Sequence, residues 1–160
     1  MEYSVATITS ESSTRPKTYE LIKTAAGTLH TDGTLSVTFN AVTPGNYYVA
    51  VKGSNIIETW SSQPQVLGSV ALTYDFTTSA AKAYGNNMVQ LNDGTWAMMS
   101  GDINHDGIVD PSDYAVWELD FNNFSFGVFA TDLNGDGIVD PSDYAIWELN
   151  FNKFIFAYYP

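Results

Sequence analysis

Oxygen-bearing side chains recur at fixed spacing in two stretches of the chain, DINHDGIVDPSD at residues 102–113 and DLNGDGIVDPSD at residues 132–143. In each stretch an acid or asparagine falls at positions 1, 3, 5, 9 and 12. Aligning residues 102–126 with residues 132–156 gives 19 identities in 25 positions, which indicates an internal duplication. The candidate ligands are Asp102, Asn104, Asp106, Asp110 and Asp113 in the first stretch and Asp132, Asn134, Asp136, Asp140 and Asp143 in the second.

The spacing of these oxygens is that of a calcium loop. Calcium takes about six to eight oxygen ligands, and an EF-hand loop supplies them with a sharp glycine turn at position 6 and a backbone carbonyl at position 7. Gly107 and Gly137 occupy position 6, and Ile108 and Ile138 occupy position 7. A solvated turn would explain one isolated match. Two complete matches in tandem favour two bound calcium ions, and an all-oxygen ligand set disfavours zinc or copper.

The negative charge of the chain is concentrated in the repeats. The net charge is −12: residues 1–100 hold seven acids and five bases, whereas residues 101–160 hold eleven acids and one base, Lys153. Nucleic acids and anionic membranes bind clusters of Lys and Arg, so neither is an expected partner. No apolar run approaches the roughly 20 residues that span a membrane.

Carboxylates about 5 Å apart repel by roughly 3 kcal/mol per pair at an effective dielectric near 20, so we expect a loop without its cation to be loose.

A helix is expected after each loop. In the first repeat Asp110 can cap a helix whose first residue is Pro111, and Asp113 lies in the first turn, where the helix dipole favours a negative charge. We also expect Val109 and Val139, at position 8, to meet across the pair of loops. Aromatic residues recur along the helices at a spacing that predicts a core face: Tyr114, Trp117 and Phe121, repeated as Tyr144, Trp147 and Phe151.

The segment before the first loop, TWAMMSG at residues 95–101, is too short for the entering helix of an EF-hand, and position 12 carries Asp in place of Glu. With these two features, residues 101–156 resemble a dockerin, a domain of two tandem loop–helix calcium repeats. The resemblance implies that the ten side chains above are calcium ligands, joined by the carbonyls of Ile108 and Ile138. It also implies a cohesin as the protein partner, held by the helix faces and by loop positions 10 and 11; a neighbouring domain is the alternative partner. Those loop positions are Pro111, Ser112, Pro141 and Ser142.

Residues 1–97 have the pattern of a β-sandwich, with short alternating segments separated by turn signals such as TDGT and TPGN. The order of these segments resembles the immunoglobulin-like or transthyretin-like domains of secreted bacterial proteins. We therefore predict a mixed fold, with an immunoglobulin-like β-sandwich domain at residues 1–97 and a small α domain at residues 98–160. The expected strands are residues 3–9, 19–24, 35–39, 47–53 and 70–76.

The whole layout resembles the C-terminal modules of large secreted bacterial proteins, many of which act on polysaccharides. This resemblance implies a secreted or cell-surface protein whose export signal lies outside this chain. Carbohydrate binding by the β domain is the alternative function, because exposed flat aromatic side chains can stack on sugar rings, although in strands they more often pack in the core. The candidate aromatics are Trp60, Trp96, Tyr47 and Tyr48.

No catalytic site is expected in this sequence. The two histidines, His30 and His105, lie in different regions, and neither has an obvious catalytic partner. A carboxylate that holds calcium is a poor general base, and no nucleophile, phosphate-loop or zinc motif is present. We therefore predict a non-catalytic module with a structural or docking role.

Overall fold

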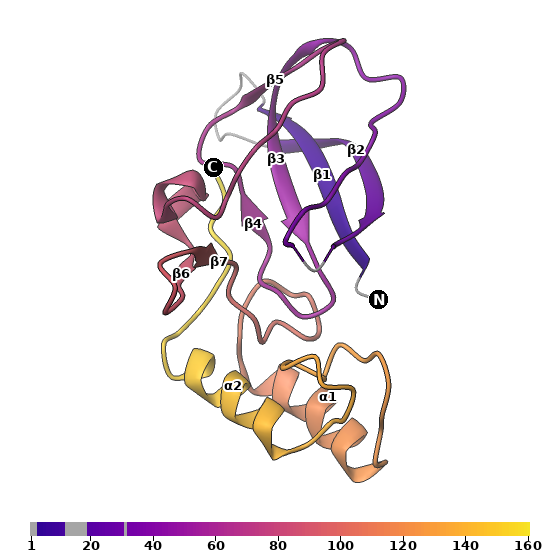
Figure 1. Ribbon diagram of the computed structural model, residues 1–160, viewed down its shortest axis with the longest axis vertical. Helices are drawn as coiled ribbons and strands as arrows, with labels where there is room; N and C mark the ends of the chain where they lie inside the picture. Colours follow the sequence, from indigo (N-terminus) through magenta and orange to yellow (C-terminus); the bar gives the residue numbers. More distant parts are fainter. Residues whose placement is uncertain (1–2, 12–18, 31) are drawn as a thin grey trace.

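The computed structural model describes residues 3–11, 19–30 and 32–160 of the chain. A β-rich part occupies one end of the molecule and two helices occupy the other (Figure 1). The C-terminal segment runs back from the helices toward the β-rich part (Figure 1). The mixed architecture is the one that the sequence predicts. The domain boundary at residue 97 stays a prediction.

An antiparallel sheet forms most of the β-rich part. Its hydrogen-bonded order is β2-β1-β3-β4, and β5 also pairs with β3. Opposite residues include Val5 with Lys52 and Thr7 with Ala50, and the β1–β2 register shifts between Ile8 and Thr9. Three of the expected strands are thereby confirmed. The strands are β1 (Tyr3–Glu11), β2 (Tyr19–Thr28), β3 (Gly45–Lys52), β4 (Thr59–Trp60) and β5 (Gln65–Leu67).

The other two expected strands, residues 35–39 and 70–76, are not strands. The first of them keeps the predicted alternation, since Leu35, Val37 and Phe39 are half-buried and the residues between them are exposed. Leu35 and Val37 pack so closely over β2 that a Cβ atom added to Gly27 would lie 2.7 Å from Leu35 Cδ1. This segment therefore covers the sheet through its side chains without a ladder of backbone hydrogen bonds.

A second sheet of the size found in an immunoglobulin-like sandwich is not present among the described residues. The other sheet there has two strands, β6 (Val89–Gln90) and β7 (Trp96–Ala97). Two short 3-10 helices, η1 (Ala80–Lys82) and η2 (Tyr84–Asn86), precede it. The observed N-terminal part is thus a pair of small antiparallel sheets, and the immunoglobulin-like prediction holds only at the level of β-rich structure.

The two helices begin where the sequence predicts. Helix α1 (Pro111–Asn122) and helix α2 (Pro141–Phe151) each start at a proline and are capped by the preceding aspartate. In α1 the capping box is reciprocal, since Asp110 Oδ1 accepts the Ser112 N–H (2.7 Å) and Asp113 Oδ2 accepts the Asp110 N–H (2.9 Å). Both helix starts are therefore fixed by the residues of the loop that precedes them.

The repeated aromatics form the core between the helices, as predicted. Trp117 stacks on Phe121 with ring centroids 4.9 Å apart, and the Tyr114 and Tyr144 rings meet edge to face at 5.8 Å. The second repeat copies the stack, with Trp147 and Phe151 at 5.0 Å. The aromatic faces of the two helices thus pack against each other.

The two position-8 valines do not share a cluster, so the prediction that they meet across the loops is wrong. Val139 packs with Ile103 and Trp117, whereas Val109 lies in a separate cluster. Each valine instead pairs its backbone with the segment that follows a helix: Val109 N–H donates to Ile155 O (2.9 Å), and Val139 N–H donates to the Ser125 carbonyl (3.1 Å). Those segments occupy the place where the other loop was expected.

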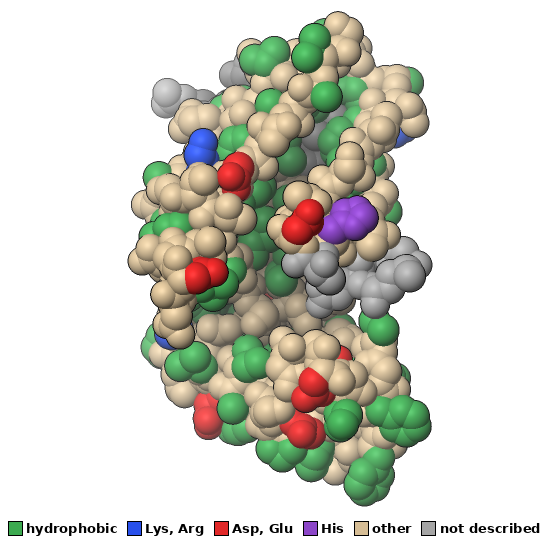
Figure 2. Space-filling view, viewed as in Figure 1, with side chains coloured by type: hydrophobic (Ala, Val, Ile, Leu, Met, Phe, Trp, Pro, Cys, Tyr) green, Lys and Arg blue, Asp and Glu red, His purple; other side chains and the backbone are tan. Residues whose placement is uncertain are grey.

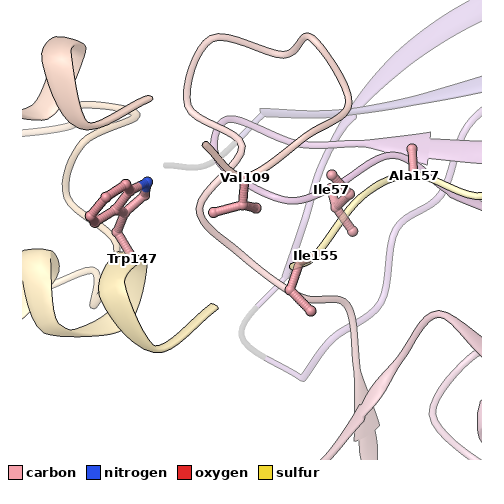
Figure 3. Close-up of a cluster of buried hydrophobic side chains, with 5 residues drawn as sticks. All are labelled: Ile57, Val109, Trp147, Ile155 and Ala157. Carbon is pink, nitrogen blue, oxygen red and sulfur yellow. The ribbon is translucent and has the colours of Figure 1, made fainter. Parts of the chain in front are cut away.

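The cluster around Val109 joins the two ends of the molecule (Figure 3). Ile57 enters it from the β-rich part, Trp147 from α2, and Ile155 and Ala157 from the C-terminal segment. Ile57 is fully buried there. The β-rich part and the repeats therefore share one hydrophobic core.

Candidate calcium sites

The loops turn through left-handed backbone at positions 4 and 6. Gly107 and Gly137 at position 6 both have φ 87°, and His105 and Gly135 at position 4 have φ 63° and 76°. A side chain at such a φ is strained, which explains glycine at position 6 in both repeats. At Gly107 an added Cβ would also lie 2.9 Å from the Tyr159 hydroxyl. The first loop is therefore in close contact with the C-terminal segment.

The position-12 aspartates close the two loops. Asp113 is completely buried; its Oδ1 accepts the N–H groups of Ile103 (2.7 Å) and Asn104 (3.0 Å), and its Oδ2 accepts that of Asp110. Asp143 makes the same three bonds, at the same lengths, in the second loop. The shorter Asp side chain at this position thus ties the beginning of each loop to the start of its helix.

Position 1 of the first loop holds a carboxylate oxygen without a hydrogen-bond donor. Asp102 is 2% exposed; its Oδ2 accepts the Gly107 N–H (3.2 Å), while its Oδ1 is buried and has no partner among the described residues. Burial, and then the negative charge of Asp113, raise the pKa of Asp102 to about 6. A buried carboxylate in this state lacks a positive partner, so Asp102 fits a cation ligand.

The middle positions of the loop are linked to one another. Asn104 Oδ1 accepts the Asp106 N–H (2.9 Å), and Asp106 Oδ1 accepts the Ile108 N–H (3.0 Å). Ser112, at position 11, lies among three predicted ligands: its Oγ accepts from Asn104 Nδ2 (2.5 Å), donates to Asp110 Oδ1 (2.6 Å) and lies 3.4 Å from Asp106 Oδ2. The structure therefore also gives Ser112 a place inside the loop, which the sequence analysis did not foresee.

The second loop repeats this arrangement with one difference. Asp132 Oδ1 accepts the N–H groups of Gly135 (2.9 Å) and Asp136 (3.2 Å), and its Oδ2 accepts that of Gly137 (2.9 Å). Ser142 again contacts Asn134 and Asp140 through its hydroxyl. Both oxygens of Asp132 thus have donors within the loop, whereas one oxygen of Asp102 does not.

The carboxylates of the predicted ligands are turned toward N–H groups of their own loops. Among residues 3–11, 19–30 and 32–160, no three His, Cys, Asp or Glu side chains lie close enough to hold a metal ion by themselves. Calcium loops also use an amide oxygen, a backbone carbonyl and water, and here Asn104 and Ile108 would supply the first two. The donor chemistry and the unpaired oxygen of Asp102 fit calcium.

The residues predicted to contact a partner lie on the surface. Pro111, Ser112, Pro141 and Ser142 are all exposed. Leu119 and Leu149, on the outer sides of the two helices, are also exposed. Figure 2 shows hydrophobic and acidic side chains side by side on the surface of the helical end. These positions are accessible in both repeats.

The aromatics proposed for sugar binding are mostly inside the molecule. Trp60 is 5% exposed and packs with Tyr48, and Tyr47, the preceding residue of β3, is buried outside that cluster. Trp60 also meets the ring of Tyr159 edge to face at 5.8 Å. Trp96 alone of the four is half-buried. The four side chains therefore do not form a flat platform on the surface.

Paired loop–helix repeats whose predicted ligands are all oxygen atoms have the arrangement of a calcium-loop module. In a comparison with protein families, residues 100–152 match the model of the dockerin type I domain. The chain therefore contains a dockerin type I domain, preceded by a β-rich region. A search of curated proteins and a search of solved structures found no match. Among the described residues, no helix is long and apolar enough to pass through a lipid bilayer.

Asn55 is a site residue that sequence reasoning missed. It belongs to the β-rich part, yet its Nδ2 donates to the Asp132 carbonyl (3.2 Å) and its backbone carbonyl accepts the Gly101 N–H (2.8 Å). No local pattern marks this residue, because the contact depends on how residues far apart in sequence pack.

Proposed function

We propose that this protein is a calcium-dependent docking module whose dockerin domain binds a cohesin-type partner. Dockerin type I domains imply calcium and cohesin binding. The single observation that best supports the proposal for this chain is the buried, unpaired Oδ1 of Asp102 inside a loop of calcium-type spacing.

The ten predicted side chains and the carbonyls of Ile108 and Ile138 would hold one calcium ion in each loop. When bound, calcium supplies the positive charge that offsets the crowded carboxylates. At free calcium about 100 times the dissociation constant, each site would add roughly 2.7 kcal/mol to the free energy of unfolding. Two such sites are comparable with the whole stability of a small domain. We expect calcium to govern whether the repeats are folded.

The proposed partner surface consists of the outer sides of α1 and α2 with loop positions 10 and 11. These positions carry the same residues in both repeats and are exposed in both. A surface of this kind can present the same side chains in two orientations related by a half-turn. Leu119 and Leu149 would supply apolar contact, and Glu118 and Glu148 would supply charge.

We also infer an extracellular place of action, because dockerin modules belong to extracellular cellulosomal proteins. Extracellular calcium reaches millimolar levels, which suits loops of moderate affinity. A role without catalysis agrees with the use of the clustered acids as ligands. No observation favours the sugar-binding alternative, since the proposed aromatics are largely buried.

The proposal is tested by surface plasmon resonance with a panel of type I cohesins, in calcium and in EDTA. Binding in calcium that is lost in EDTA supports it. Leu119→Asp and Leu149→Asp, made singly and together, distinguish one binding orientation from two, since both side chains are exposed on the proposed surface and lie outside the loops. If both orientations are used, each single variant still binds and the double variant does not. Binding that is equal in EDTA and in calcium would contradict the proposal.

A further inference from the structure

Asn55 connects the β-rich part to the beginning of each repeat. Its side chain donates to the carbonyl of Asp132, which is position 1 of the second loop. Its own backbone carbonyl accepts the N–H of Gly101, which directly precedes position 1 of the first loop. Asn55 is 6% exposed, so water does not compete freely for these hydrogen bonds.

The backbone around Asn55 is held along the start of the first repeat. Ile56 forms an antiparallel bridge with Ser100, and the Ile57 N–H donates to Met99 O (2.8 Å). On the other side, His105 Nε2 lies 2.9 Å from the Gly53 carbonyl. Because Ile57 is also buried in the shared core (Figure 3), residues 53–57 have a fixed place beside the first loop. These backbone contacts of residues 53–57 therefore hold the Asn55 amide in position to donate to the Asp132 carbonyl.

The chemistry of this position requires a donor. The Asp132 carbonyl can accept from the Asn55 amide, whereas a carboxylate would repel it and an apolar side chain would leave it without this bond. The groups that orient metal ligands from outside the ligand shell commonly affect affinity about 10-fold to 100-fold when they are removed. The Asn55 amide, which holds the backbone of the first residue of the second loop, belongs to this class.

We propose that Asn55 is a positioning residue for the second calcium loop, through which the β-rich part raises the calcium affinity of the dockerin domain. The inference rests on the proposed calcium binding and adds a residue from outside the repeats. The coupling is reciprocal, so calcium in turn stabilises the contact between the β-rich part and the repeats.

The test uses Asn55→Leu in the full chain, since leucine keeps the branched shape of the asparagine side chain and removes the donor. Asn55→Leu combined with Asp102→Ala leaves only the second site, where calorimetric titration should give a calcium dissociation constant about tenfold higher than for Asp102→Ala alone. Asn87→Leu is the matched control, because Asn87 is also a buried asparagine of the β-rich part but donates to Phe156 O (3.1 Å) in the C-terminal segment. It should leave the second site's constant unchanged.

A purely structural role for Asn55 predicts a different result. The melting temperature would then fall by the same amount in EDTA and in calcium while the dissociation constant stayed the same, and this result would overturn the inference. If Asn55→Leu does not fold, Asn55→Ala is judged by the same criterion, since alanine removes the amide donor without adding volume. Absence of calcium binding in the unsubstituted protein would instead overturn the proposed function.

Discussion

At the scale of single residues, Asp102 and Asp132 occupy the same loop position in different surroundings. Asp132 accepts three N–H groups from its own loop, whereas Asp102 accepts one and keeps a buried oxygen without a donor. Asp102 is also the more buried of the two, at 2% exposed against 7% for Asp132. The first calcium site is therefore predicted to respond to protons.

The first site should lose affinity as the pH falls. Because the pKa of Asp102 is raised to about 6, this carboxyl is mostly ionised at pH 7 and mostly protonated at pH 5, where calcium must displace a proton. In Asp132→Ala, which keeps only the first site, the calcium dissociation constant should rise about tenfold between pH 7 and pH 5. Calorimetric titration at the two pH values measures this. Equal constants would show that calcium does not compete with a proton at Asp102.

At the scale of elements, Asp110 has two roles that can be separated. It caps α1 through the Ser112 N–H and is a predicted ligand at position 9. Hydrogen bonds from Ser112 lower the pKa of Asp110, so the carboxylate is the stable form at neutral pH. The same residue thus links the loop to the helix it begins.

Substitutions at Asp110 should separate capping from calcium binding. Asparagine retains a capping oxygen and alanine does not, so at saturating calcium Asp110→Ala should be less stable than Asp110→Asn by about 1 kcal/mol. Both variants should bind calcium more weakly than the unsubstituted protein. Urea denaturation with circular dichroism at 222 nm gives the two free energies of unfolding. Equal values would show that capping by Asp110 contributes little.

The elements that the sequence predicted correctly are those with local signals. The helix starts follow from Asp110–Pro111 and its repeat, and the loop turns follow from Gly107 and Gly137, because caps and turns depend on neighbouring residues. Strand formation depends on a distant partner, so the alternation in residues 35–39 predicted burial correctly but not hydrogen bonding. For the same reason, neither the separation of Val109 from Val139 nor the contact of Asn55 was visible in the sequence.

At the scale of the whole molecule, the β-rich part and the dockerin domain share a hydrophobic core, and the C-terminal segment contacts both. Ala157 N–H donates to Gly107 O (2.7 Å), and Asn87 Nδ2 donates to Phe156 O, so the C-terminal segment is bound on one side to the first loop and on the other to the β-rich part. Ile57 completes the contact from the sheet side. We infer that the two parts stabilise each other.

Removing the Ile57 side chain should destabilise the protein through this shared core. Ile57 is fully buried against Val109 and Trp147, so Ile57→Ala should lower the free energy of unfolding by about 2–5 kcal/mol in calcium. Val66→Ala, on an exposed position of β5, is the control and should change it by less than about 0.5 kcal/mol. Urea denaturation compares the two, and a similar small effect of both substitutions would contradict a shared core.

The central claim, that each loop holds one calcium ion, is tested most directly by calorimetric titration of calcium into EDTA-stripped protein, with Asp102→Ala and Asp132→Ala beside it. We predict two sites in the unsubstituted protein, one site in each variant, and a gain of helical circular dichroism as calcium binds. A stripped protein that is already fully helical and takes up no calcium would contradict the claim, as would two remaining sites in either variant.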